Sequence, residues 1–172
     1  MKRLPPVAVA IALLAAGCSS STTPTSTTPT NPTFTATLSP ANEVPPITNA
    51  ESVATGTASI TFVTSKDSAG NITSASATFV VNLTNLPAGS TVNIAHIHEC
   101  DRTCSGGIVV STTLVAGEVT VTNGVASFTK AGITVLPELA QRILNNPAGF
   151  YFNVHSNLNP GGFARGQLNR VT

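Results

Sequence analysis

Charged side chains are scarce in this sequence. Only 9% of its 172 residues are Asp, Glu, Lys or Arg, and the formal net charge is +1. Nucleic-acid-binding proteins need clustered basic residues to neutralise phosphates, and this chain has no such cluster. The sequence therefore argues against a nucleic-acid partner.

The motifs of common enzyme classes are also missing. The sequence contains no nucleophile elbow, phosphate-binding loop or metalloprotease motif. Its seven acidic residues show no suggestive pairing for glycoside hydrolysis. The residues predict a protein that is not an enzyme.

The N-terminus predicts export. A short basic segment precedes residues 7–16 (VAVAIALLAA), an uncharged apolar run, so residues 1–17 are interpreted as a signal peptide. At about ten residues the run is too short to span a bilayer as a helix, which needs ~20. Residues 14–18 (LAAGC) resemble a bacterial lipobox, which implies a lipid on the sulfur of Cys18. An ordinary cleaved signal with a chance cysteine is the alternative.

A tether follows the signal. Residues 18–33 are rich in Ser, Thr and Pro and offer no apolar side chain to a core, so they are predicted to remain flexible. Several acyl chains on Cys18 would anchor the protein stably to a membrane. The expected location is the cell envelope, in the outer membrane or at the cell surface, facing the periplasm or the exterior.

Residues 34–172 have the size of one domain with its own core. Thr and Val dominate and turn residues recur at short intervals, which predicts an all-β fold. We expect an antiparallel β-sandwich or barrel of about eight strands. The segments with strand character are 34–38, 53–64, 72–83, 91–98, 108–114, 118–121, 125–128, 150–155 and 163–169.

Three local signals are specific. Loop residues 66–71 predict a hairpin between the two long strands, and Asn123-Gly124 predicts a tight turn. One short helix is expected near residues 137–145, where apolar residues recur at helical spacing and Pro137 suits the first turn.

Several segments, taken in order, resemble the CHRD (chordin-type) domain. They are 42–46 (NEVPP), 95–98 (AHIH), 151–155 (YFNVH), 159–162 (NPGG) and 165–168 (RGQL). The resemblance implies an extracellular β domain, found in chordin and in many bacterial secreted proteins, and it implies no reaction. Two departures lie near these segments: residues 99–104 replace a Gly-Pro-type turn, and Phe163 replaces an acidic residue.

All three histidines of the chain, His96, His98 and His155, lie in these segments. Residues two apart in a strand project to one face, so His96 and His98 share a face. His155 ends another strand and supplies a third ligand if the strand ends meet. Imidazoles suit copper or zinc, so a Cu- or Zn-binding site is one interpretation. Structural imidazoles, hydrogen-bonded to the backbone, Asn153 or Arg165, are the other.

Residues 96–99 (HIHE) also resemble the copper-binding strand of copper–zinc superoxide dismutases. That family uses four copper histidines and a separate zinc site, which three histidines cannot fill. The chain therefore has too few histidines for dismutase activity. Of the functions considered, a metal-dependent redox enzyme is the least favoured.

The remaining candidates are cysteines and charges. Cys100 and Cys104 are expected to form a disulfide after export; a two-histidine, two-cysteine metal site with His96 and His98 is the alternative. Arg165 is expected to bind an anion or to pair with Glu43 or Glu99. Taken together, these features predict a lipid-anchored protein whose domain is a non-catalytic binding or structural module. Its partner would be an unidentified protein or surface polymer.

Overall fold

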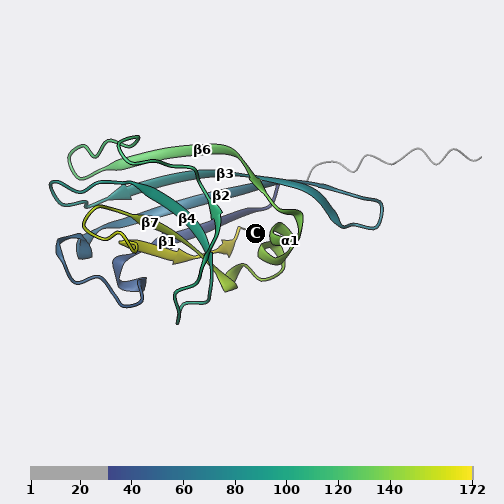
Figure 1. Ribbon diagram of the computed structural model, residues 1–172, viewed down its shortest axis with the longest axis horizontal. Coiled ribbons are helices and arrows are strands. Elements are labelled where there is room, and N and C mark those ends of the chain that lie inside the picture. The colour runs from purple at the N-terminus through teal and green to yellow at the C-terminus, as the bar shows by residue number, and fades with distance from the viewer. Residues whose placement is uncertain (1–30, 172) are drawn as a thin grey trace, which may run out of the picture.

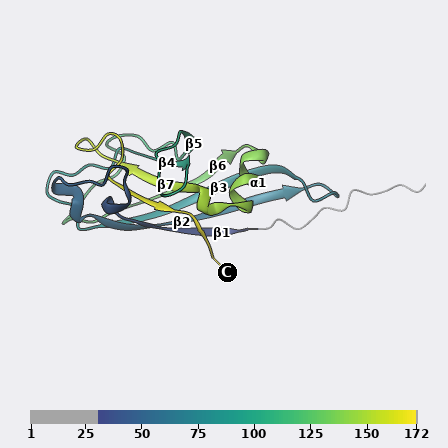
Figure 2. The same cartoon turned by 90° about the horizontal axis from the view of Figure 1, so that it is seen from below.

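Two antiparallel sheets packed face to face make up the fold (Figures 1 and 2). The computed structural model describes residues 31–171, so the predicted signal peptide, Cys18 and most of the tether lie outside the described residues. Within that range there are nine strands and one α-helix. The all-β prediction is confirmed, and the arrangement is a sandwich.

Each sheet mixes strands from distant parts of the sequence. The five-stranded sheet has the spatial order β6 (Ala126–Val135), β3 (Ile72–Thr84), β2 (Thr55–Lys66), β1 (Thr33–Leu38) and β9 (Asn169–Arg170). The four-stranded sheet has the order β5 (Ile108–Ser111), β4 (Ile94–Glu99), β7 (Phe150–His155) and β8 (Ala164–Gln167). Three short 3-10 helices lie in the connections: Pro40–Asn42, Ala50–Val53 and Pro147–Gly149.

The long hairpin of β2 and β3 forms as its sequence predicts. Asp67 stabilises the turn, because its Oδ1 accepts from the backbone amides of Ala69 and Asn71. Apolar residues alternate with polar ones along both strands, which turns one face of the sheet to the core and the other to solvent.

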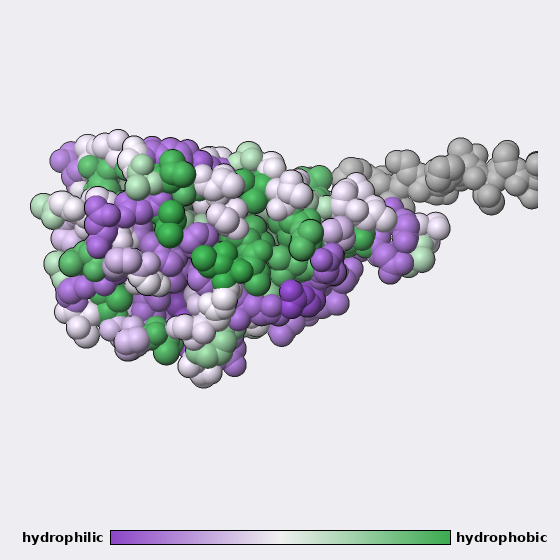
Figure 3. Space-filling model, viewed as in Figure 1, coloured by the Kyte–Doolittle hydropathy of each residue, from purple (hydrophilic) through white to green (hydrophobic). Residues whose placement is uncertain are grey.

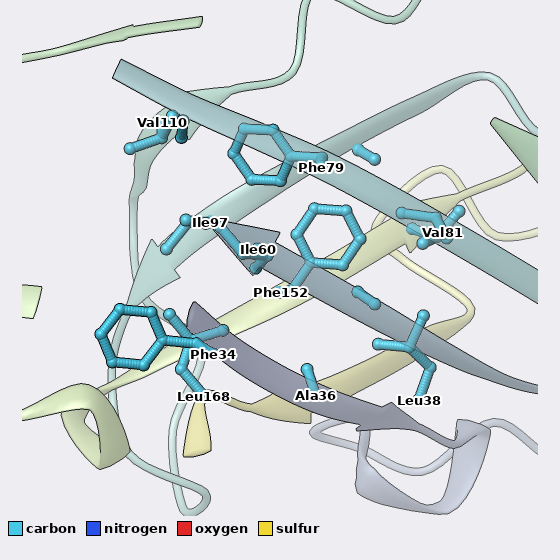
Figure 4. Packing of buried hydrophobic residues seen from close by; sticks show 14 of the residues in the cluster. Phe34, Ala36, Leu38, Ile60, Phe79, Val81, Ile97, Val110, Phe152 and Leu168 are labelled. Carbon is cyan, nitrogen blue, oxygen red and sulfur yellow. The ribbon is translucent and has the colours of Figure 1, made fainter. Parts of the chain in front are cut away.

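Aromatic and aliphatic side chains from both sheets fill the space between them (Figure 4). The rings of Phe79 on β3 and Phe152 on β7 stack across the sandwich, with centroids 5.7 Å apart. Ile60 and Ile97, both fully buried, lie in the same layer. The core therefore joins the two sheets directly.

Helix α1 (Pro137–Asn145) covers the end of the large sheet that the small sheet leaves free (Figure 2). Its bounds are those predicted. Pro137 occupies the first turn, and Leu139 and Ile143 bury one helical face against β3. Pro147 cannot continue the helix and begins the following 3-10 turn.

Three strand predictions need correction. The predicted strand 118–121 is reduced to an isolated bridge between Val92 and Val119. The strand expected over 125–128 extends to Val135 as β6, because β3 offers it a partner along its whole length. The strand expected over 163–169 changes sheets, giving β8 in one and β9 in the other.

The two sheets meet along one edge. Ser39, directly after β1, exchanges backbone hydrogen bonds with Arg165 of β8, at 3.1 and 3.4 Å. The approach is so close that a Cβ at Gly166 would lie 2.2 Å from the carbonyl oxygen of Thr37. Glycine is therefore required there, since no side chain fits between the backbones.

The surface is a mixture of polar and apolar residues (Figure 3). On the face shown, apolar residues gather towards the middle, beside the position of α1 in Figure 1. No helix within residues 31–171 has the length and apolar character needed to cross a membrane.

Candidate functional site

The outer face of the four-stranded sheet is covered as well as its core face. Every residue of β7 is buried. Phe152 and Val154 belong to the core, so alternation along the strand turns Tyr151, Asn153 and His155 to the outer face. We call this the covered face.

Loops close over the covered face. Residues 43–49 and 158–162, together with His98, Tyr151 and Asn153, contribute to the lining of a cavity of about 450 Å³. The NEVPP and NPGG segments thus lie against the strands that carry AHIH and YFNVH. Segments far apart in the sequence are thus brought together around one cavity.

The three histidines come together on the covered face. His96 and His98 project from β4, and His155 ends the neighbouring strand β7. The Nδ1 atom of His96 lies 3.2 Å from the Nε2 atom of His155. One ring nitrogen from each histidine lies within 4.8 Å of those of the other two, and all three side chains are buried. We call these residues the histidine cluster.

Backbone carbonyls orient two of the rings. The Nδ1 atom of His98 lies 3.0 Å from the carbonyl oxygen of Gly106, and that of His155 lies 2.9 Å from the carbonyl oxygen of Pro160. Because a carbonyl oxygen can only accept, each Nδ1 carries the proton. In the neutral ring each Nε2 then presents a lone pair. The Nε2 of His98 has no hydrogen-bond partner among the described residues.

Burial keeps the histidine cluster neutral. Desolvation, together with the neighbouring His155 and His98, lowers the pKa of His96 to about 4. Desolvation also lowers the pKa of His98 and of His155, although the carbonyl partners act in the opposite direction. At neutral pH the rings are therefore uncharged, the form that binds metal ions.

Tyr151 links the histidines to a buried arginine. Its ring stacks on that of His98, with centroids 4.8 Å apart and planes 5° from parallel. The Cζ atom of Arg165 lies 4.0 Å from the centroid of the same ring. The Tyr151 hydroxyl also accepts from the amide of Gly106, so the ring is fixed at its edge as well as on its faces.

Arg165 acts on the backbone of the loop after β4. Its Nη1 donates to the carbonyl of Cys104 at 2.9 Å, and its Nη2 donates to the carbonyl of Asp101 at 3.3 Å. The side chain is only 1% exposed. A buried guanidinium with several carbonyl acceptors holds a loop in place more firmly than an exposed ion pair would.

The expected ion pair of Arg165 with Glu43 or Glu99 is not formed within residues 31–171. Glu99 pairs instead with Arg142 of α1, with Oε1 and Nη1 2.5 Å apart. Glu99 is exposed at the end of β4, whereas Arg165 is buried, so a surface arginine reaches the carboxylate more readily.

Cys100 and Cys104 form a disulfide, with Cα atoms 5.9 Å apart, so the predicted bridge is confirmed. The bridged loop is also bound to β8, because Gln167 Nε2 donates to the carbonyl of Cys100 and Arg165 to that of Cys104. While the bridge is formed, neither sulfur is free to bind a metal ion together with His96 and His98.

Glu43 lines the cavity as a buried carboxyl. It is 7% exposed, and its Oε1 has no hydrogen-bond partner among the described residues. Burial raises the pKa of Glu43 to about 7, and the charge of Arg165 opposes part of that rise. The group therefore binds its proton more tightly in the folded protein than in the unfolded chain.

Glu43→Gln is expected to remove a pH-dependent loss of stability. In the wild type, the stabilisation from the protonated carboxyl is complete below pH 4.5 and is lost as pH rises towards 7. The loss amounts to up to about 3 kcal/mol. Urea unfolding of both proteins from pH 4 to 8 measures the difference, in which the histidine contributions cancel. Glu138→Gln, at an exposed position, is the matched control; a wild-type-minus-Gln difference that is flat with pH contradicts the prediction.

Sequence reasoning missed Glu51. This residue is fully buried, and its Oε2 accepts from Ser156 Oγ at 2.6 Å and from Asn159 Nδ2 at 2.5 Å. Asn49 also hydrogen-bonds Asn159. The network ties the 3-10 helix Ala50–Val53 to the loop after β7. Asn159 belongs to the NPGG segment, which was the one available signal, but nothing in the sequence around Glu51 marks its burial.

The fold and the covered face define a class: an antiparallel β-sandwich in which loops lie over the outer face of the four-stranded sheet and line a cavity beside its buried polar residues. The family model of the CHRD domain matches residues 34–168, most of the chain. The chain therefore belongs to the CHRD domain family, and this membership supports a non-catalytic module in general. Comparisons with curated proteins and with solved structures gave no match.

Proposed function

We propose that the chain is an exported, lipid-anchored protein of the cell envelope that presents its CHRD domain as a binding or structural module. One observation carries the proposal. A lipobox-like segment ends at Cys18, a Ser/Thr/Pro-rich tether follows, and the CHRD match begins directly after it at residue 34.

The disulfide supports export independently of the N-terminus. Bridges such as Cys100–Cys104 form and persist in oxidising compartments and are rare in the cytosol. This bridge lies in the domain, so it does not depend on how residues 1–30 are interpreted.

The tether suits display at a distance from a membrane. Residues 19–33 would span at most ~50 Å when fully extended. The prolines of this segment favour extended conformations, so the segment would hold the domain away from the lipid surface. The proposed partner, a protein or a surface polymer, then has access to the domain.

The loops over the covered face are the candidate contact surface. Side-chain hydrogen bonds fix these loops. Arg165 and Gln167 bind the loop that contains the Cys100–Cys104 bridge, and Glu51 binds Ser156 and Asn159. Loops fixed before binding lose little conformational entropy when a partner binds, which favours affinity. This rigidity, with no enzyme motif in the sequence, supports a binding or structural role.

Cys18→Ser is expected to abolish lipid attachment and membrane association. The full chain would be expressed in a bacterial host with two membranes, labelled with an alkyne fatty acid, and fractionated. The wild type should carry label and pellet with membranes, whereas Cys18→Ser should be unlabelled. Ser19→Ala is the matched control, since it leaves the lipidated cysteine in place. An unlabelled wild-type protein in the soluble fraction contradicts the proposal.

A further inference from the structure

The histidine cluster contains an unpaired buried nitrogen. His98 is 7% exposed, and its Nε2 has no hydrogen-bond partner among the described residues. Leaving a buried polar atom without a partner costs about 1–3 kcal/mol, so such an atom calls for an explanation. The other two histidines lie beside it on the same face, with one nitrogen each within 4.8 Å.

We propose that His96, His98 and His155 bind one transition-metal ion, Zn(II) or Cu(II), through three imidazole nitrogens. This goes beyond the display function proposed above and does not rest on lipid anchoring. Nothing in the family membership assigns a metal to these residues.

The donor set selects the class of ion. The three ligands are nitrogens, and no carboxylate or thiolate from residues 31–171 is grouped with them. Calcium and magnesium prefer oxygen ligands, whereas imidazoles suit zinc and copper. Three imidazoles with a further position for water or another ligand form a known arrangement for zinc.

The spacing of the nitrogens is close to what one ion needs. Metal–nitrogen bonds of about 2.0–2.1 Å place ligand nitrogens roughly 3.3–3.6 Å apart in tetrahedral or trigonal geometry. His96 Nδ1 and His155 Nε2 are 3.2 Å apart, and one ring nitrogen of each of the three histidines lies within 4.8 Å of the others. Small rotations of the side chains then bring three nitrogens to the distances that one ion needs.

The hydrogen bonds made by the other ring nitrogens of His98 and His155 match those of metal-bound histidines. A metal-bound histidine almost always donates its other ring N–H to a carbonyl or carboxylate. The carbonyls of Gly106 and Pro160 accept from His98 Nδ1 and His155 Nδ1, which leaves both Nε2 lone pairs for the ion. The stacked ring of Tyr151 further restricts His98.

Without an ion, the same geometry gives a different hydrogen-bond pattern. His155 Nε2 has a lone pair, so the 3.2 Å contact requires His96 Nδ1 to carry a proton and donate. On metal binding, His96 Nδ1 must offer a lone pair instead, and the ring proton moves to Nε2. The proposal therefore predicts a tautomer change at His96 and none at His98 or His155.

The test uses the full-length chain carrying Cys18→Ser, which has no free thiol to compete for metal. Calorimetric titration with ZnCl₂ and with CuSO₄ should give saturable one-to-one binding for at least one ion. His96→Gln, His98→Gln and His155→Gln should each weaken it by at least roughly tenfold. Asp101→Asn is the matched control, because it changes an exposed carboxylate in the loop after β4 and leaves all three histidines in place. The affinity of this variant for the ion should be unchanged.

Imidazole ¹⁵N NMR spectra test the proposal without any histidine substitution, so the result does not depend on whether a variant folds. The chain has three histidines, so every imidazole signal of the Cys18→Ser chain reports this site. Zn(II) should shift one nitrogen of each ring and exchange the protonated nitrogen of His96. Unchanged spectra at saturating Zn(II) with no calorimetric binding of either ion, or binding lost in Asp101→Asn but kept in His98→Gln, overturn the proposal. Neither result bears on the fatty-acid labelling of Cys18, so the two proposals fail separately.

Discussion

Gly166→Ala is expected to destabilise the domain by roughly 3 kcal/mol, at the upper end of what overpacking a core costs. The added Cβ would lie 2.2 Å from the carbonyl oxygen of Thr37 and 2.8 Å from its carbonyl carbon. Both are backbone atoms, so no side-chain rotation relieves the contact. The edge where β1 meets β8 must then separate, and the Ser39–Arg165 hydrogen bonds weaken with it.

The free energy of unfolding in guanidinium chloride measures this effect. Gly107→Ala is the matched control, because a Cβ there meets nothing within 4 Å. Gly107→Ala should change the unfolding free energy by less than about 1 kcal/mol. Equal effects of the two substitutions would show that the sheets do not meet as closely as described.

Arg165→Met is expected to cost about 2–4 kcal/mol. The substitution removes both donors from the carbonyls of Cys104 and Asp101, and each acceptor left without a partner is destabilising. It also removes the cation from the ring of Tyr151, a contact that contributes more when desolvated. Methionine keeps much of the volume, so the loss reports the guanidinium rather than a cavity.

Two measurements identify the cause. Arg170→Met, on exposed β9, should change the unfolding free energy by less than about 0.5 kcal/mol. Arg165→Met should also raise the pKa of Glu43 further, since the charge of Arg165 lowers it in the wild type. An unfolding free energy close to that of the wild type would mean that water replaces the guanidinium at the loop carbonyls.

Elements with local causes were predictable from the sequence. The bounds of α1 follow from Pro137 and the helical spacing of its apolar residues, and both lie within nine residues of chain. The turn at Asn123-Gly124 forms with positive φ at both positions, as that dipeptide favours. Such signals need no knowledge of the rest of the fold.

Elements with distant causes were not predictable. Residues 129–135 became strand because β3 lies beside them, although Gly132 has low strand propensity. The acceptors of Arg165 are backbone carbonyls, which no sequence pattern marks, so reasoning from charges favoured carboxylates instead. Both sides of β4 are buried, so alternation along that strand does not reveal which face carries His96 and His98.

The route by which load would enter the domain follows from the position of β1. Strand β1 begins at Thr33 and runs between β2 and β9 to Ser39, which is hydrogen-bonded to Arg165. If the domain is anchored through its N-terminal side, as proposed above, a pull enters along the axis of β1 and loads its six residue pairs with β2 and the backbone hydrogen bonds between Ser39 and Arg165.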